Sequence, residues 1–203
     1  MHAEQGESPQ PPGPPPHAGF GPELRVDWLT PSDLADNLPG RLGMTFLPGK
    51  RGASTRYAPH VYRRDAGEDL AALRGAGAVA LVLLVTDAEL ARWGDPAIER
   101  LGMERGLRVL RHPMPDGSPP ASVEEARAIL DEIRTGRADG DVVVACMGGV
   151  GRTGTIASCA LVAAGLTAPQ AIARVRSVRH PTAVETDAQE SFVERFAELV
   201  PSS

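Results

Sequence analysis

Residues 141 to 154 place a run of β-branched residues directly before a glycine-rich turn and a helix-forming segment. The run reads Asp-Val-Val-Val-Ala-Cys, and Gly148, Gly149 and Gly151 follow it. An unbroken run of this kind is typical of a strand buried in a parallel sheet, and the apolar residues from Thr153 onward favour a buried helix. We therefore expect an α/β fold in which a central, mostly parallel sheet is flanked by helices on both faces.

The turn between this strand and helix has the residue types of an anion-binding loop. Its backbone N–H groups lie at a helix N-terminus, where they have no intrahelical partner and where the helix dipole is positive. Glycine allows the backbone to wrap closely around a bound group. We expect a phosphate-binding cradle formed by Met147, Gly148, Gly149, Val150 and Gly151.

A cysteine and an arginine flank this loop. Cys146 lies at its mouth, and Arg152 follows after five intervening residues. A thiol beside an arginine at a helix N-terminus ionises more readily than a free thiol, and the thiolate is the nucleophile. The planar guanidinium of Arg152 suits two oxygens of one phosphate. The hydroxyl of Thr153 either donates to the departing sulfur of a phosphocysteine or only begins the helix.

The Cys-x5-Arg-Thr-Gly sequence resembles the signature of the cysteine-dependent protein tyrosine and dual-specificity phosphatases. Residues 40–50, which include Leu-Pro-Gly, are similar to the N-terminal part of the kinase-associated phosphatase (cyclin-dependent kinase inhibitor 3-like) group and its bacterial relatives. The resemblance implies a dual-specificity phosphatase-like fold and hydrolysis of phosphate monoesters through a cysteinyl phosphate. The family usually has histidine before the cysteine, whereas this chain has Ala145. A catalytically weak, phosphate-binding pseudophosphatase is therefore an alternative.

Other nucleotide- and anion-binding loops fit less well. Gly149, Gly151 and Gly154 match a dinucleotide-binding fingerprint, but that fold requires a second strand that ends in an acidic residue, and residues 173–179 are helical and basic. An ATP-binding loop needs a Gly-Lys pair where Arg152 stands. A rhodanese-like sulfurtransferase also holds a cysteine in an anion-binding loop. The Arg-Thr-Gly sequence and a separate carboxylate loop argue against it.

That carboxylate is Asp116, in a proline-rich loop at residues 111–120. The Asp-Gly pair alone favours a simple turn. The resemblance implies instead that this loop carries the general acid that protonates the leaving oxygen, so we predict that role for Asp116. Gln189 similarly resembles the glutamine that orients the hydrolytic water, although Thr186 and Gln189 also satisfy a capping box.

Local patterns predict the remaining elements. We expect strands at 24–29, 78–85 and 107–110 and helices over 66–75, after Thr86, from Ser122 to Gly136, and after Thr167.

Two sets of charged residues are interpreted as structural. Asp87 and Glu89 follow Thr86 at capping-box spacing, so we read them as helix caps rather than catalytic carboxylates. Arg174, Arg176 and Arg179 are expected to form a solvated basic helix face, and the alternative is that Arg179 and His180 reach the mouth of the site.

Length, composition and charge indicate the domain organisation and the kinds of partner to expect. The chain of 203 residues is long enough for one well-buried domain, which we place at residues 23–200. Residues 1–22 contain seven of the 19 prolines and are predicted to be a disordered tail. A net charge of -5 argues against a nucleic-acid partner, and the apolar run at 78–85 is too short to span a membrane.

The two cysteines indicate a reducing compartment, which suits an enzyme that uses a thiolate. Cys159 is predicted to pack in the core, and two cysteines in unrelated contexts do not form a disulfide framework. We expect a cytoplasmic monomer without a cofactor or metal, acting on a phosphorylated protein or another phosphate ester.

Overall fold

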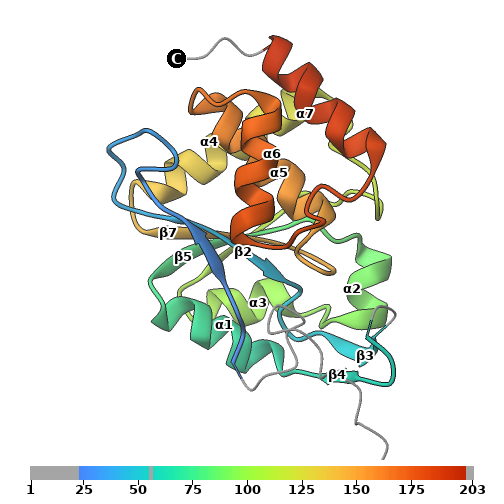
Figure 1. Ribbon diagram of the computed structural model, residues 1–203. Helices are drawn as coiled ribbons and strands as arrows, with labels where there is room; N and C mark the ends of the chain where they lie inside the picture. Colours follow the sequence, from blue (N-terminus) through green and yellow to red (C-terminus); the bar gives the residue numbers. More distant parts are fainter. Residues whose placement is uncertain (1–22, 55–56, 200–203) are drawn as a thin grey trace, which may run out of the picture.

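A five-stranded sheet forms the centre of the protein in a computed structural model that describes residues 23–54 and 57–199 (Figure 1). Its strands lie in the order β1 (Asp27–Leu29), β2 (Leu42–Phe46), β7 (Asp141–Cys146), β5 (Ala78–Leu83) and β6 (Arg108–Arg111). The β1 strand is antiparallel to β2, and all other neighbours are parallel. The predicted mostly parallel sheet is confirmed, while the predicted tail at residues 1–22 lies outside the described residues.

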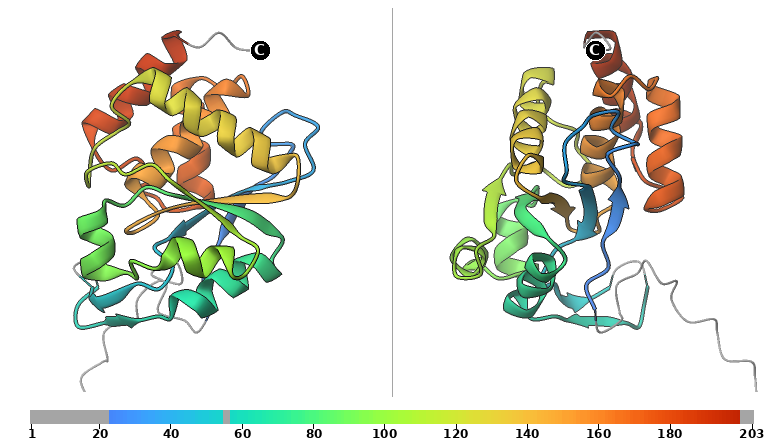
Figure 2. Two further views of the ribbon diagram at one scale, coloured as in Figure 1. Left: turned by 180° about the vertical axis from the view of Figure 1, so that it is seen from behind. Right: turned by 90° about the vertical axis from the view of Figure 1, so that its left-hand side faces the viewer.

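Helices cover both faces of this sheet, as Figures 1 and 2 show. One layer contains α1 (Ala66–Gly75), α2 (Asp87–Trp93) and α3 (Ile98–Met103). The other contains α4 (Val123–Arg137), α5 (Gly151–Ala163), α6 (Ala168–Val178) and α7 (Asp187–Leu199). A separate hairpin is formed by β3 (Arg51–Ala53) and β4 (Val61–Arg63).

Two apolar clusters hold the layers together. Along β7, Val142 and Val144 belong to the cluster under α4–α7, and Val143 and Ala145 belong to the cluster over α1–α3. Each fully buried valine or leucine stabilises the fold by about 1.5–3 kcal/mol relative to an exposed side chain. Because side chains alternate along a strand, Cys146 returns to the α4–α7 side of the sheet.

Several predicted boundaries match the structure, and a few differ from it. The helix over residues 66–75 is confirmed, and the side chains of Thr86, Ser122 and Thr167 cap their helices as predicted. The first strand is shorter than predicted, because only residues 27–29 pair with β2.

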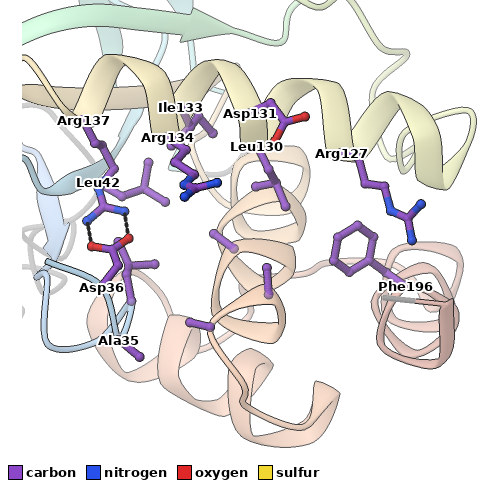
Figure 3. A pocket seen from close by; sticks show the side chains of 14 residues that line it. Ala35, Asp36, Leu42, Arg127, Leu130, Asp131, Ile133, Arg134, Arg137 and Phe196 are labelled. Carbon is purple, nitrogen blue, oxygen red and sulfur yellow. Dashed lines mark hydrogen bonds and ion pairs between the residues drawn. The ribbon is translucent and has the colours of Figure 1, made fainter. Parts of the chain in front are cut away.

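A groove of about 460 Å³ opens between α4, α5 and α7, at the amino-terminal ends of β2 and β7 (Figure 3). Leu42, Leu130 and Phe196 contribute to its apolar wall, and the Arg137–Asp36 ion pair lies at one end. This groove is therefore separated from the glycine-rich loop, which follows the carboxyl end of β7. Among residues 23–54 and 57–199, no helix has both the length and the apolar character needed to cross a membrane.

Candidate active site

The predicted site residues meet where the parallel strands end. Cys146 is the last residue of β7, Glu89 lies in the helix that follows β5, and Asp116 lies in the loop that follows β6. Carboxyl ends of parallel strands share one edge of a sheet, and this edge is where ligands bind in open α/β folds. The topology thus brings residues from three separate segments to one place.

The glycine-rich loop lies at the N-terminus of the 13-residue helix α5, which begins at Gly151. Cys146, Gly149, Val150 and Gly151 are buried, Met147 is half-buried and Gly148 is exposed. Gly149 has φ +66°, and a Cβ atom there would lie 2.2 Å from the carbonyl oxygen of Thr45. Glycine is therefore required at this position both for its conformation and for the close approach of β2.

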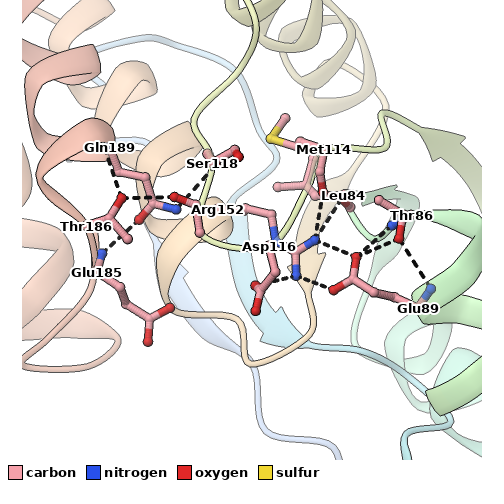
Figure 4. A network of polar contacts seen from close by, with 11 residues as sticks. Leu84, Thr86, Glu89, Met114, Asp116, Ser118, Arg152, Glu185, Thr186 and Gln189 are labelled. Atoms are coloured by element: carbon pink, nitrogen blue, oxygen red, sulfur yellow. Dashed lines mark hydrogen bonds and ion pairs between the residues drawn. The ribbon is translucent and has the colours of Figure 1, made fainter.

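Arg152 is the most enclosed charged group of the site, with a side chain that is 1% exposed. Its Nη1 and Nη2 donate to the two carboxylate oxygens of Glu89 at 2.8 and 2.7 Å (Figure 4). Such a bidentate pair fixes the plane of the guanidinium. Glu89 also accepts from the backbone N–H of Thr86 at 2.9 Å, so it closes the predicted capping box at the same time.

The remaining donors of Arg152 face the loop that follows β6. Nη1 donates to the carbonyl oxygen of Met114 at 2.8 Å, and Nη2 donates to Oδ1 of Asp116 at 2.8 Å. Nε is buried and has no hydrogen-bond partner among the described residues. Glu89 thus occupies one edge of the guanidinium, while the Nε–Nη2 edge retains an unused donor for an incoming anion.

The charges in this cluster stabilise one another. Burial alone would lower the pKa of Arg152, but the hydrogen bond to Glu89 and the negative charges of Cys146, Glu89 and Asp116 outweigh burial and raise it. Burial would raise the pKa of Glu89, yet the hydrogen bond from Arg152 holds it below its usual value of 4.5. Both groups remain charged near neutral pH.

Asp116 lies above this cluster on an exposed loop that α7 supports. Its side chain is 78% exposed. The hydroxyl of Thr186 donates to the carbonyl oxygen of Gly117 at 2.9 Å, and Nε2 of Gln189 donates to that of Ser118 at 3.3 Å. The N-terminus of α7 therefore holds the two residues that follow Asp116.

Gln189 lies next to the glycine-rich loop and is fully buried. A Cβ atom on Gly151 would lie 3.1 Å from its amide. Its side-chain Oε1 accepts from the backbone N–H of Glu185 at 2.8 Å. The backbone N–H of Gln189 donates to the hydroxyl of Thr186 at 3.2 Å. Only the Thr186 half of the predicted capping box is therefore formed.

The other predicted positions are buried in different surroundings. The Thr153 hydroxyl is buried and has no hydrogen-bond partner among the described residues. Cys159 is fully buried in the apolar cluster, and burial raises the pKa of its thiol well above the usual range. Ala145 is fully buried on the α1–α3 side of β7.

One expectation is wrong. Arg179 does not lie on a solvated face, because its side chain is only 1% exposed. Its Nε and Nη2 donate to the carbonyl oxygens of Gly149 and Gly148 at 2.8 and 3.2 Å, and Nη1 donates to Asp27 at 2.7 Å. Helical periodicity placed it outward, but it is the C-cap residue of α6, beyond the last residue of that helix.

Glu89 was likewise missed as a site residue. Its spacing from Thr86 is fully explained by a helix cap, so nothing in the local sequence indicates that Glu89 also pairs with Arg152. The available signal was its place just after a buried strand of a parallel sheet, where functional carboxylates gather. In the described part of the chain, no three His, Cys, Asp or Glu side chains are grouped so as to hold a metal ion.

Comparison with known proteins yields similar chains that cover most of this one. The cyclin-dependent kinase inhibitor 3 of Rattus norvegicus is 27% identical over 176 residues, covering 85% of this chain and 78% of the relative, and that of Homo sapiens is 26% identical. The structure of Tk-PTP in its active form is 30% identical, with a TM-score of 0.63, covering 80% of this chain and 95% of Tk-PTP.

A second structure supports the fold. Kinase-associated phosphatase, in which the catalytic cysteine is replaced by serine, has a TM-score of 0.76 at 24% identity and covers 88% of this chain and 96% of that one. A family model described as a polymorphic toxin system DSP-PTPase phosphatase matches residues 59–166, just over half of the chain, including Asp116, Cys146 and Arg152. The chain therefore belongs to this DSP-PTPase phosphatase family, within the dual-specificity phosphatase superfamily.

Proposed function

We propose that this phosphatase hydrolyses phosphate monoesters through a cysteinyl-phosphate intermediate on Cys146, and that it acts as a protein tyrosine or dual-specificity phosphatase. The observation that carries the proposal is the arrangement around Arg152. Its guanidinium is fixed by Glu89 on one edge and keeps a buried, unused Nε donor on another. Cys146 and the helix N-terminus of α5 complete a site for a phosphate dianion.

In the first step, the thiolate of Cys146 attacks phosphorus. An S–P bond forms while the bond from phosphorus to the ester oxygen breaks, and the electron pair of that bond leaves with the oxygen. Asp116 in its acid form gives this oxygen a proton. Arg152 and the loop amides hold the remaining phosphate oxygens and stabilise the charge of the transition state.

In the second step, water attacks the phosphocysteine. A new O–P bond forms, the S–P bond breaks and the electron pair returns to sulfur, while the carboxylate of Asp116 takes a proton from the water. The hydroxyl of Thr153 can donate a hydrogen bond to the departing sulfur, and Gln189 can orient the water. Both side chains are buried beside the loop, which supports these assignments.

Asp116 must change partners during this cycle. It accepts a hydrogen bond from Nη2 of Arg152, which belongs to the edge that a phosphate would use. Phosphate binding therefore displaces Asp116 from the guanidinium. Its exposed loop position allows the carboxyl group to move to the leaving oxygen.

The relatives favour a phosphorylated protein as substrate. Tk-PTP, a protein described as a PTP, is 30% identical and covers 80% of this chain. PTPMT1, solved with the phosphoinositide PI(5)P, is similar at 14% identity, which bears on the fold alone.

A colorimetric assay with p-nitrophenyl phosphate, with and without a chelator, tests the proposal. Turnover that persists in chelator and is absent in Cys146→Ser supports it. Turnover that the chelator removes, or that Cys146→Ser retains, contradicts the covalent mechanism. Cyanide-dependent sulfur transfer from thiosulfate would identify a sulfurtransferase, and phosphate binding without any turnover would identify a pseudophosphatase.

A further inference from the structure

We infer that Arg179 is a positioning residue of the phosphate loop, which turns the loop amides toward the bound oxyanion from outside the loop. This inference rests on the proposed function of the loop as a phosphate site. Arg179 lies outside the Cys146–Arg152 segment and follows helix α6.

Arg179 donates hydrogen bonds to consecutive carbonyl groups of the glycine-rich loop. Nη2 and Nε donate to the carbonyl oxygens of Gly148 and Gly149, at 3.2 and 2.8 Å. The next carbonyl, that of Val150, accepts from the backbone N–H of Val184 at 3.3 Å and from that of Gly154, within α5, at 3.1 Å. Three successive carbonyl oxygens of the loop are thus engaged by the segment that follows α6.

This engagement determines where the loop amides point. In a trans peptide the C=O of one residue and the N–H of the next lie in one plane and point in opposite directions. When the carbonyls of Gly148, Gly149 and Val150 are held on one side, the N–H groups of the residues after them are directed to the other side. Those amides are the donors that an oxyanion needs in the loop.

A second contact keeps the guanidinium of Arg179 in place. Nη1 donates to Oδ2 of Asp27 at 2.7 Å, and Arg25 binds the other oxygen of the same carboxylate at 2.7 Å. A guanidinium that is 1% exposed would be strongly destabilising without such a partner. The antiparallel strand β1, which carries Asp27, is thereby tied to the catalytic loop.

The chain offers a matched control for the loss of a buried arginine. Arg137 has a side chain that is 4% exposed, donates to the carbonyl oxygen of Gly40 at 2.8 Å and pairs with Asp36 at 2.7 Å. It lies at the amino-terminal end of β7, away from the loop. Arg179→Met and Arg137→Met therefore remove the same kinds of bond at opposite ends of the sheet.

Two measurements test the inference without requiring turnover. The first is the dissociation constant of inorganic phosphate by calorimetry. The second is the rate of Cys146 alkylation by iodoacetate, an anion, relative to iodoacetamide, which is neutral. A loop whose amides face inward favours the anion, so the ratio of the two rates reports oxyanion recognition rather than fold stability.

We expect Arg179→Met to bind phosphate at least about tenfold more weakly, equivalent to the loss of about one strong hydrogen bond, and to lower the alkylation ratio. Arg137→Met should change neither. Arg179→Lys keeps the positive charge that pairs with Asp27, so this variant should fold. Its ammonium group cannot donate to both carbonyls as the planar guanidinium does, so phosphate should bind more weakly.

Unchanged phosphate affinity and alkylation ratio in folded Arg179→Met would overturn the inference, as would equal losses in Arg137→Met. If Arg179→Met does not fold, a wild-type affinity and ratio in Arg179→Lys would overturn it. Failure of the loop as a phosphate site has a different signature, because wild-type protein would then bind no phosphate and show no preference for iodoacetate.

Discussion

Among single residues, Glu89 and Arg152 form the pair on which the proposed chemistry rests. This pair joins positions 63 residues apart through two hydrogen bonds, and the arginine is almost fully enclosed. Removing the charge of Glu89 leaves the enclosed guanidinium with only the exposed Asp116 as a carboxylate partner, which is more costly than losing a surface ion pair.

Glu89→Gln should lower the free energy of unfolding by about 3 kcal/mol near neutral pH and should weaken phosphate binding. Because Arg152 holds the pKa of Glu89 below 4.5 in the folded protein, the contribution of Glu89 is complete above that value. It is lost as the pH falls through the folded pKa. Urea unfolding at several pH values should show the difference between mutant and wild type shrinking in acid.

Asp87→Asn is the control for this prediction, since its side chain is 89% exposed and pairs with Arg111. It should change stability by less than about 1 kcal/mol. An equal loss in both variants, or a Glu89→Gln deficit that does not depend on pH, would contradict the proposed coupling to Arg152.

The two cysteines should also behave differently. Cys146→Ser should abolish turnover yet retain phosphate binding, because the loop and Arg152 remain. Cys159→Ala should retain most of the turnover, because that thiol only packs in the apolar cluster. Steady-state kinetics and calorimetry on both variants give the comparison, and loss of turnover in folded Cys159→Ala would show a role that packing does not explain.

Among the elements, α7 and the residue before it, Thr186, contact the loop that carries Asp116, the proposed general acid. Thr186 bonds the carbonyl of Gly117, directly after Asp116. Thr186→Val keeps the shape of the side chain but removes this bond, together with the acceptor for the backbone N–H of Gln189. We expect slower turnover of substrates with poor leaving groups, which need protonation by Asp116, with phosphate affinity unchanged.

Thr182→Val is the matched control, since Thr182 is exposed and its hydroxyl contacts only His180 among the described residues. The measurement is kcat for a series of aryl phosphates of different leaving-group pKa. Equal losses across the series, or a loss in Thr182→Val as well, would show that the Thr186 bond does not act through Asp116.

Local patterns were sufficient to predict many of the elements, although not β2, the β3–β4 hairpin or α3, because the causes of the predicted ones lie within a few residues. The apolar run at 78–85 and the capping residues Thr86, Ser122 and Thr167 act on their own segments. The contacts that hold the candidate site together join residues that are far apart in the sequence. Arg179 and Asp27 are 152 positions apart, and no periodicity in either segment indicates that they meet.

At the scale of the whole molecule, the relatives match a phosphatase domain that occupies most of the chain. The similarity to kinase-associated phosphatase covers 88% of it. The proline-rich residues 1–22 contain no candidate for the chemistry.

A variant without residues 1–22 should therefore hydrolyse p-nitrophenyl phosphate with unchanged kcat and KM. The described residues 23–54 and 57–199 already contain the strands, helices and loop that form the candidate site. Parallel assays of the full and shortened chains provide the check, and a drop in turnover of about tenfold or more, equivalent to at least 1.4 kcal/mol of transition-state stabilisation, would assign the tail a part in catalysis.

In the proposed mechanism, Cys146 carries the phosphoryl group during turnover. Mass spectrometry of enzyme quenched in acid during hydrolysis of p-nitrophenyl phosphate tests it most directly. We expect a phosphoryl group on Cys146 in the wild-type protein and none in Cys146→Ser. Asp116→Ala should show more of it with the same activated substrate, because water attack is slowed. Sustained wild-type turnover with no phosphoryl group on Cys146, even in Asp116→Ala, would contradict the covalent mechanism.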